Sequence, residues 1–215
     1  DAEDQTLAPP EARIGESETV RCCLAFDDAF VGLVAKERVT AVCSRLLGDY
    51  FVVMQQNGIV NPPQREHTQT AYHRDLPYQH FISSRPLAVS ALFCIDPFNP
   101  DNGATHVIPA SHRIEQFPSE AAVRELERPV SAPAGSFIVF DSMLFHRAGH
   151  NTSASPRRAV NQVYSLPFIA QQFSLAAMTG NRFAGEPALA RLLGYGAGPV
   201  SSVEQWWTRR ERKQS

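Results

Sequence analysis

The stretch that decides the fold is residues 136–168, which read SFIVFDSMLFHRAGHNTSASPRRAVNQVYSLPF. A β-rich run ends at His146, a loop rich in turn-forming residues follows, and a second β-rich run begins near Arg157. We interpret the stretch as a β-hairpin with a wide loop. If the loop is centred near residues 151–152, Arg157 lies opposite His146, and opposed residues have Cβ atoms about 5 Å apart. Both side chains would then enter one cavity.

Other short β-rich runs surround this hairpin and are separated by Pro, Gly, Asn and Asp. The expected strands are residues 19–26, 50–55, 87–95, 105–108, 136–140 and 159–166. Many short strands in one chain favour a sandwich or a barrel, and the jelly roll is a common solution. We therefore predict a mainly β fold of the jelly-roll type, with flanking α-helices.

The flanking helices show the usual helical signals. Asp27 and Asp28 can cap a helix that runs to about Leu47, and Gly48 is a natural stop. The apolar stripe at helical spacing, which indicates packing on the main core, consists of Val31, Ala35, Val39, Val42 and Leu46. Further helices are expected at residues 119–127, 169–179 and 186–193.

With 215 residues, the chain is expected to form one domain over residues 1–215. Its parts are an arm or loop at residues 1–18, a jelly-roll core at residues 50–168 and a C-terminal helical segment at residues 169–215. A net charge of -2 argues against a nucleic-acid partner. No apolar run reaches the length of about 18 residues that a membrane span requires, so no membrane partner is expected.

The cysteines and the ends of the chain carry weaker signals. The four cysteines, whose spacing fits neither a zinc finger nor a CxxC motif, are Cys22, Cys23, Cys43 and Cys94. We interpret them as reduced, mostly buried thiols. Because the N-terminus also lacks the order of a signal peptide, we expect a cytoplasmic protein. Trp206 and Trp207 are expected to cover the core or a subunit contact, which leaves a homodimer open.

The segment Tyr72-His73-Arg74-Asp75 contains the first candidate for chemistry. In an extended segment, residues i and i+2 point the same way, so His73 and Asp75 can present an imidazole and a carboxylate to one point. His146 would add a second imidazole. Two histidines and one carboxylate form the facial triad of non-haem iron(II) oxygenases, which leaves coordination positions open. A pair of one histidine and one aspartate is weak evidence alone.

A longer pattern strengthens this hypothesis. After His73 and Asp75 come Asn102-Gly103, then Pro109-Ala110-Ser111-His112, then His146, Asn151, and Arg157 eleven residues after His146. In this order the pattern resembles the phytanoyl-CoA dioxygenase-like family of Fe(II)/2-oxoglutarate-dependent oxygenases, over about residues 66–168. The one departure is Ala110, which stands where the family usually has glycine.

The resemblance implies a double-stranded β-helix, which is a cupin-like jelly roll, and a dioxygenase that oxidises a small organic molecule. Fe(II), 2-oxoglutarate and O2 would be required, and succinate and CO2 would be released. The catalytic and metal-binding residues would be His73, Asp75 and His146. The presence of Asp75 favours hydroxylation or another oxidation over halogenation, because related halogenases lack this carboxylate.

The remaining candidate residues would bind the two organic molecules. A guanidinium grips a carboxylate with two parallel hydrogen bonds, so Arg157 is expected to bind 2-oxoglutarate. Its neighbour Arg158 should point to the other face of the strand. Gln69 and Asn161 are further candidates for the cosubstrate pocket. Candidates for contact with the primary substrate are Tyr78 and His80.

Two other readings of the same residues stay open. A cupin-like metal isomerase or a zinc hydrolase would use the two histidines and the carboxylate but would not need Arg157, and the HExxH helix of many zinc hydrolases is absent. A non-catalytic barrel that binds a small molecule would not need the metal ligands. Formation of succinate from 2-oxoglutarate separates these readings from the dioxygenase.

Overall fold

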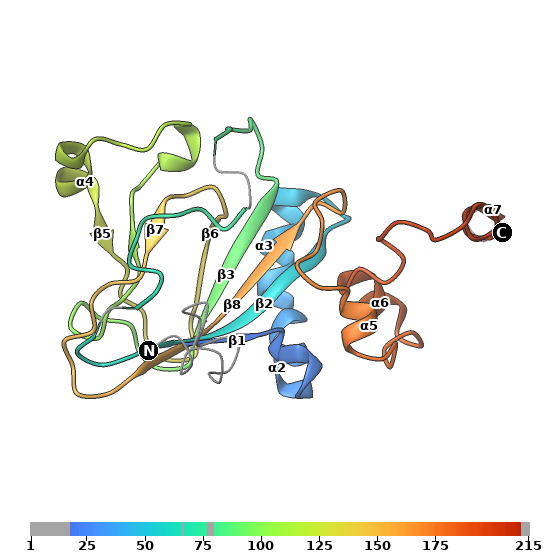
Figure 1. Ribbon diagram of the computed structural model, residues 1–215, viewed down its shortest axis with the longest axis horizontal. Helices are drawn as coiled ribbons and strands as arrows, with labels where there is room; N and C mark the ends of the chain where they lie inside the picture. The colour runs from blue at the N-terminus through green and yellow to red at the C-terminus, as the bar shows by residue number, and fades with distance from the viewer. Residues whose placement is uncertain (1–17, 66, 77–79, 212–215) are drawn as a thin grey trace, which may run out of the picture.

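The structure, a computed structural model, describes residues 18–65, 67–76 and 80–211. It contains two antiparallel sheets, one of five strands in the order β1-β2-β8-β3-β6 and one of three strands in the order β5-β4-β7. The strands are β1 (Thr19–Arg21), β2 (Val52–Asn61), β3 (Ala88–Cys94), β4 (His106–Val107), β5 (Arg128–Pro129), β6 (Phe137–Asp141), β7 (His146–Arg147) and β8 (Arg157–Ser165). The smaller sheet lies beside the larger one, on the left in Figure 1.

Two helices, α2 (Asp28–Val34) and α3 (Glu37–Leu47), cover the other face of the large sheet, whereas α4 (Glu120–Leu126) lies beside the small sheet (Figure 1). The C-terminal segment contains α5 (Leu175–Met178), α6 (Pro187–Leu192) and α7 (Val203–Glu211), and two 3-10 turns are η2 (Cys23–Ala25) and η3 (Ser111–Arg113). The mainly β fold with flanking helices is therefore confirmed, although the large sheet does not close into a barrel.

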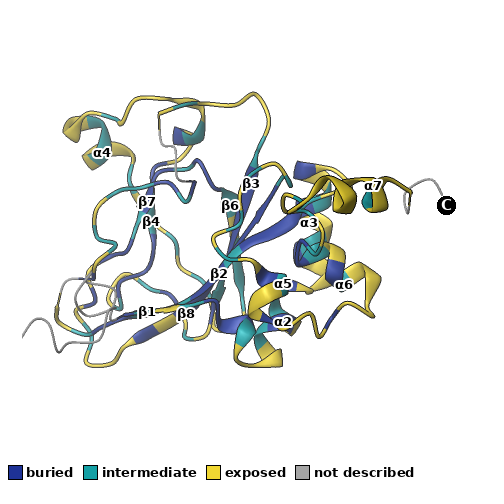
Figure 2. Cartoon of the chain, turned by 45° about the vertical axis from the view of Figure 1, so that its right-hand side comes forward, coloured by how far each residue is buried: buried dark blue, intermediate teal, exposed yellow. Residues whose placement is uncertain are grey.

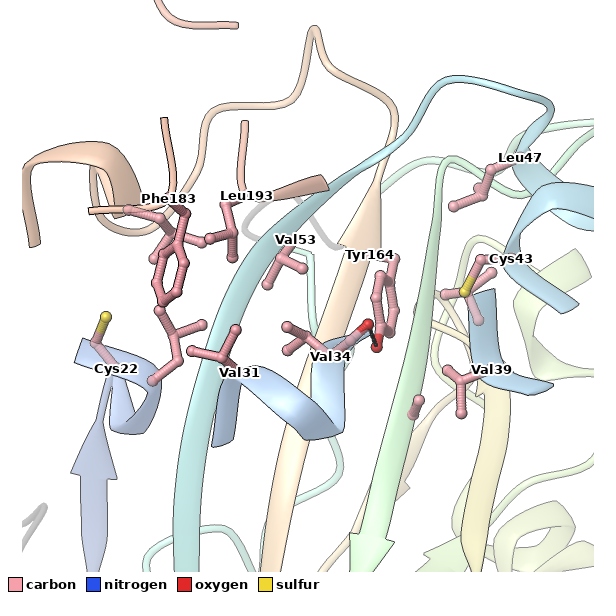
Figure 3. Packing of buried hydrophobic residues seen from close by; sticks show 14 residues of the cluster. Cys22, Val31, Val34, Val39, Cys43, Leu47, Val53, Tyr164, Phe183 and Leu193 are labelled. Atoms are coloured by element: carbon pink, nitrogen blue, oxygen red, sulfur yellow. Dashed lines mark hydrogen bonds between the residues drawn. The ribbon is translucent and has the colours of Figure 1, made fainter. Parts of the chain in front are cut away.

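The central strand β8 is buried on both faces because helices pack on one side and the site lies on the other. The larger apolar cluster fills the space between α2, α3 and the sheet, and it includes Val34, Val39, Val53 and Tyr164 (Figure 3). The buried Tyr164 hydroxyl donates to the Val34 carbonyl oxygen at 3.0 Å. Figure 2 shows the same division, with buried strands at the centre and exposed helices at the periphery.

Most expected strands form, and most of their ends lie within two residues of the expected positions. Two strand boundaries differ clearly from expectation. The strand expected at residues 19–26 ends at Arg21, because Cys22 takes a left-handed conformation with φ of 55° and starts the turn η2. The strand expected at residues 50–55 extends to Asn61 as β2. This extension matters because its far end pairs with the first residue of β8, at Asn61 and Arg157.

The single helix expected up to Leu47 is wrong, because α2 ends at Val34 and α3 begins at Glu37. The Asp27 cap is confirmed, since its carboxylate accepts a hydrogen bond from the Ala29 amide at 2.8 Å. The break shifts the helical phase and therefore changes which residues reach the core. Val31 and Val39 are buried as expected, but Val34, Cys43 and Leu47 replace the other members of the stripe, and Val42 and Leu46 are exposed.

The hairpin pairing expected for residues 136–168 is also wrong. His146 lies in β7 and pairs with Val107 in the small sheet, whereas Arg157 lies in β8 and pairs with Asn61 in the large sheet. The loop between them crosses from one sheet to the other because Asn151 anchors its middle. The Asn151 side-chain amide donates to the carbonyl oxygen of Asn61 at 3.1 Å and to that of Ser155 at 2.9 Å.

The C-terminal segment is less helical than expected near residues 169–179, where only Leu175–Met178 forms a helix. The helix α7 has no buried residue, and Trp206 and Trp207 are 40% and 58% exposed. The prediction that these tryptophans cover the core is therefore wrong, and a subunit contact stays a prediction. The four cysteines are free and buried, as expected. Within the described ranges, no helix has the length and apolarity needed to cross a bilayer.

Candidate active site

The backbone brings His73 and His146 side by side at the edge of the small sheet. The two residues form an antiparallel bridge, with His73 N donating to His146 O at 3.0 Å and His146 N donating to His73 O at 3.1 Å. Asp75 N donates to Ser142 O at 3.0 Å, so the extended segment continues past the bridge. Residues 73 and 75 therefore share one face, as their spacing predicts.

The three side chains of His73, Asp75 and His146 converge on one point. Their potential ligand atoms all lie within 4.8 Å of one another. The His146 Nε2 atom lies 3.5 Å from Asp75 Oδ1, and the two imidazole ring centres are 4.4 Å apart. Each histidine places its Nδ1 atom 3.0 Å from the carbonyl oxygen two residues earlier. Since a carbonyl oxygen only accepts, Nδ1 carries the proton and Nε2 presents a lone pair to a metal.

Asp75 is held as a carboxylate by its surroundings. Burial alone would raise the pKa of Asp75, but the nearby His146 and His73 and the hydrogen bond from Ser90 hold it well below its usual range. Ser90 Oγ donates to Asp75 Oδ2 at 2.6 Å, and Asn161 Nδ2 donates to the same oxygen at 3.3 Å. The second carboxylate oxygen is directed at His146. Such outer contacts orient a metal ligand before the metal binds.

Burial, and then the proximity of His146, lower the pKa of His73, which favours the neutral imidazole that a metal requires. Burial has the same effect on His146, but the Asp75 carboxylate outweighs it and raises the pKa of His146. The two histidines therefore have opposite shifts, with Asp75 as the negative group between them.

These three residues line a cleft between the two sheets. Its empty volume is about 400 Å3, including open solvent at its mouth. The other lining residues are Ile59, Gln69, Leu92, Thr105, Phe140, Arg147, Ala148, Arg157 and Asn161. Ile59, Leu92, Phe140 and Ala148 are apolar, and the remaining lining residues bring polar or charged groups together in one cleft, as a small-molecule site requires.

Arg157 is a buried cation in this cleft, with 2% of its surface exposed. Its Nη2 atom donates to Gly103 O at 2.8 Å, and its guanidinium lies 4.2 Å from the centre of the Phe98 ring. Its Nε atom is buried without a hydrogen-bond partner in the described part of the chain. No Asp or Glu in that part forms an ion pair with it. Burial lowers the pKa of Arg157 to about 10, so the group remains charged at neutral pH.

Arg158 points to the opposite face of β8, as expected. Its side chain is 55% exposed and forms an ion pair with Asp96, with Arg158 Nη2 2.8 Å from Asp96 Oδ1 and Nε 2.9 Å from Oδ2. Arg157 and Arg158 therefore differ in environment although they are adjacent. One has a carboxylate partner at the surface, and the other faces the cleft without one.

The remaining candidates occupy different positions. Gln69 and Asn161 both line the cleft, and the Asn161 side-chain oxygen is buried without a partner among the residues the structure covers. His80 is exposed and is not among the residues that line the cleft. Tyr78 lies outside the described residues.

Sequence reasoning missed several residues that build the bottom of the site. Asn61 Nδ2 donates to Gly103 O at 3.2 Å and to Gly149 O at 2.9 Å, and Gly103 O is also the acceptor for Arg157. Gly103 has φ of 75°, and an added Cβ would collide with the Asn61 side chain. The motif around Asn102-Gly103 was a usable signal for this packing. Nothing near Ser90 in the sequence indicates its contact with Asp75.

The residues present fit an iron ion together with 2-oxoglutarate. Two imidazole nitrogens and one carboxylate from one side match a facial triad with open positions. The unneutralised guanidinium of Arg157 in the same cleft fits the far carboxylate of a molecule that chelates the metal at its other end.

Comparison with known proteins agrees with this chemistry. Residues 7–159 match the family model described as phytanoyl-CoA dioxygenase (PhyH). An uncharacterised protein of Mycobacterium tuberculosis is 32% identical over 203 residues, which cover 91% of this chain and 74% of that protein. An iron/alpha-ketoglutarate-dependent dioxygenase of Penicillium thymicola is 26% identical over 133 residues, which cover 58% of this chain and 40% of that protein.

Solved structures show the same fold. EctD from S. alaskensis, with 2-oxoglutarate and 5-hydroxyectoine, has a TM-score of 0.61 and 25% identity, covering 71% of this chain and 57% of that one. The chain therefore spans little more than half of EctD. SnoN, a non-heme alpha ketoglutarate dependent epimerase from nogalamycin biosynthesis, has a TM-score of 0.60 and 21% identity, covering 86% of this chain and 70% of that one. From the family match and the site geometry, the chain belongs to the phytanoyl-CoA dioxygenase family, as a 2-oxoglutarate-dependent non-haem iron dioxygenase.

Proposed function

We propose that this dioxygenase hydroxylates or otherwise oxidises a small organic metabolite and releases succinate and CO2 from 2-oxoglutarate. His73, Asp75 and His146 would hold Fe(II), and Arg157 would bind the far carboxylate of 2-oxoglutarate. The observation that carries the proposal is the buried, unneutralised Arg157 in the same cleft as the three metal donors. A metal-dependent isomerase or hydrolase would not need this cation.

Each residue has a defined task in this proposal. The bound iron would supply the activation of dioxygen. Asp75 would neutralise part of the metal charge, and Ser90 would keep its carboxylate oriented. Gln69 and Asn161, which line the cleft, would contact 2-oxoglutarate through their amides. The apolar residues of the cleft, Leu92 and Phe140 among them, would help to exclude water from the reacting atoms.

We infer the substrate class from the solved structures that share the fold. EctD was solved with 5-hydroxyectoine and HygX with hygromycin B, and both are small molecules. His80 and Tyr78, which follow the metal-binding segment, stay candidates for substrate contact. We further infer one domain over the whole chain and a cytoplasmic location, which the four free buried cysteines support.

The experiment is an anaerobic reconstitution with Fe(II), followed by addition of O2, 2-oxoglutarate and a panel of small metabolites. Stoichiometric succinate with an oxidised metabolite is the expected result. Zinc-loaded protein is the control, since zinc has no redox chemistry. Conversion of a metabolite by the zinc form, without succinate, would support a hydrolase or isomerase and sink the proposal.

A further inference from the structure

A second polar cluster lies next to the proposed metal centre and converges on a single oxygen atom. Glu127 Oε2 accepts from the Tyr72 hydroxyl at 2.5 Å and from Arg147 Nη2 at 2.8 Å and Nε at 3.1 Å. His106 Nδ1 lies 3.1 Å from the same oxygen. The Arg147 guanidinium also lies over the Tyr72 ring, 5.3 Å from its centre.

Two members of this cluster are direct chain neighbours of the proposed metal ligands. Tyr72 precedes His73, and Arg147 follows His146. Successive residues of an extended chain point to opposite faces. While the two imidazoles face the cleft, the Tyr72 hydroxyl and the Arg147 guanidinium both bind Glu127, which is not among the residues that line the cleft.

The backbone pairing between the two histidine segments is short. His73 and His146 form an isolated bridge, and both β7 and its partner β4 contain two residues. Two further backbone hydrogen bonds join the segments on either side of the bridge, from Asp75 N to Ser142 O at 3.0 Å and from Ala148 N to Gln69 O at 2.8 Å, and side-chain contacts add to this constraint. Glu127 stands directly after α4, where its amide bonds to Val123 O, and it thus comes from a separate element.

Glu127 can supply such a constraint because its carboxylate is a charged hydrogen-bond acceptor in a partly buried position. Its side chain is 26% exposed and that of Arg147 is 24% exposed. Burial alone would raise the pKa of Glu127, but the hydrogen bonds from Tyr72 and Arg147 outweigh it and lower the pKa. Hydrogen bonds to charged groups are among the stronger ones in proteins.

We propose that Glu127 is a positioning residue of the metal centre, which ties together the chain neighbours of His73 and His146, Tyr72 and Arg147, and thereby helps to set the spacing of the two imidazoles. The inference rests on the proposed metal site. It assigns no contact between Glu127 and the metal, because Glu127 is not among the residues that line the cleft. Its effect would be on metal affinity and coordination geometry rather than on a chemical step.

Cobalt(II) is the probe, because its visible absorption reports coordination geometry. The variants are Glu127→Ala, Glu127→Gln and, as a matched control, Asp96→Asn. Asp96 also accepts hydrogen bonds from an arginine and is 23% exposed, but it joins no residue next to a metal ligand. Loss of an outer-shell partner typically weakens metal binding by 10–100-fold. We expect about tenfold weaker Co(II) binding and an altered spectrum at saturation for Glu127→Ala, partial recovery for Glu127→Gln, and wild-type behaviour for Asp96→Asn.

An unchanged dissociation constant and spectrum in Glu127→Ala would overturn the inference while leaving the metal site intact. Equal weakening by Asp96→Asn would also overturn it, since the effect would then be general destabilisation. A wild-type protein that binds no Co(II) would instead remove the proposed function and this inference together. If Glu127→Ala does not fold, Tyr72→Phe removes one of the converging hydrogen bonds and must show a smaller loss of Co(II) affinity, or the inference fails.

Discussion

Replacing Arg157 with alanine should weaken the use of 2-oxoglutarate far more than replacing Arg158. Arg157 is 2% exposed, faces the cleft and has no carboxylate partner in the described chain. Removing it would leave the far carboxylate of 2-oxoglutarate unpaired in a buried place, which costs about 2–5 kcal/mol. At about 1.4 kcal/mol for each factor of ten, the lower figure corresponds to a rise in KM of roughly 30-fold.

Arg158→Ala is the matched control, because it removes the same charge from the adjacent residue. Its exposed ion pair with Asp96 contributes roughly 0–1 kcal/mol to stability, and KM should change little. Arg157→Lys should recover only part of the affinity, because an ammonium cannot form the bidentate fork. The assay is a titration of 2-oxoglutarate against succinate formation at saturating Fe(II) and substrate.

Thermal or urea unfolding separates binding from a structural role. At 100 times its dissociation constant, 2-oxoglutarate should stabilise the wild-type protein by about 2.7 kcal/mol. With 30-fold weaker binding, the same concentration should add only about 0.9 kcal/mol. Equal stabilisation of the wild type and Arg157→Ala, or a large KM effect confined to Arg158→Ala, would refute the assignment.

Three further predictions follow from the same geometry. Asp75→Ala should abolish succinate formation and lower Fe(II) affinity measured by equilibrium dialysis, because it removes the negative ligand; full activity would exclude the triad. Gly103→Ala should lower the free energy of urea unfolding by clearly more than Gly135→Ala. Both glycines have positive φ, so either substitution costs about 1–2 kcal/mol of backbone strain, but of the two only Gly103 also lacks space for a Cβ. Burial, with a smaller contribution from Arg157, lowers the pKa of His67 to about 4, so its neutral form stabilises the fold at high pH. As pH falls below about 6.5, His67 takes up a proton in the unfolded state before it does so in the folded state. The folded protein should therefore lose about 2 kcal/mol of stability between pH 8 and pH 5. Urea titrations at both pH values should show this loss in the wild type and not in His67→Gln.

The sequence alone determined the parts of the site that depend on local spacing. His73 and Asp75 share a face because they are two residues apart in an extended segment, and this holds in any sheet that accepts the segment. Arg157 and Arg158 point to opposite faces for the same reason. The cap at Asp27 and the stop at Gly48 depend on backbone conformation within a few residues, so they too were predictable.

Only the tertiary structure decided how these local pieces combine. The expected hairpin pairing of His146 with Arg157 fails because Asn151 binds the carbonyl oxygen of Asn61, 90 residues away, and directs the loop across to the large sheet. Both side chains still reach one cleft, but from facing sheets rather than from neighbouring strands. The phase shift between α2 and α3, which exchanges Val42 for Cys43 in the core, likewise follows from packing on the sheet.

The side-chain contacts around the proposed metal-binding residues were likewise not predictable from the sequence. Glu127 meets Tyr72 across 55 residues, and Ser90 meets Asp75 across 15. A local pattern records whether a residue prefers a strand, a helix or a turn, because that preference depends on its own backbone and nearest neighbours. It does not record which distant donor and acceptor become adjacent. That outcome depends on the pairing of strands, whose energy is shared among residues far apart in the chain.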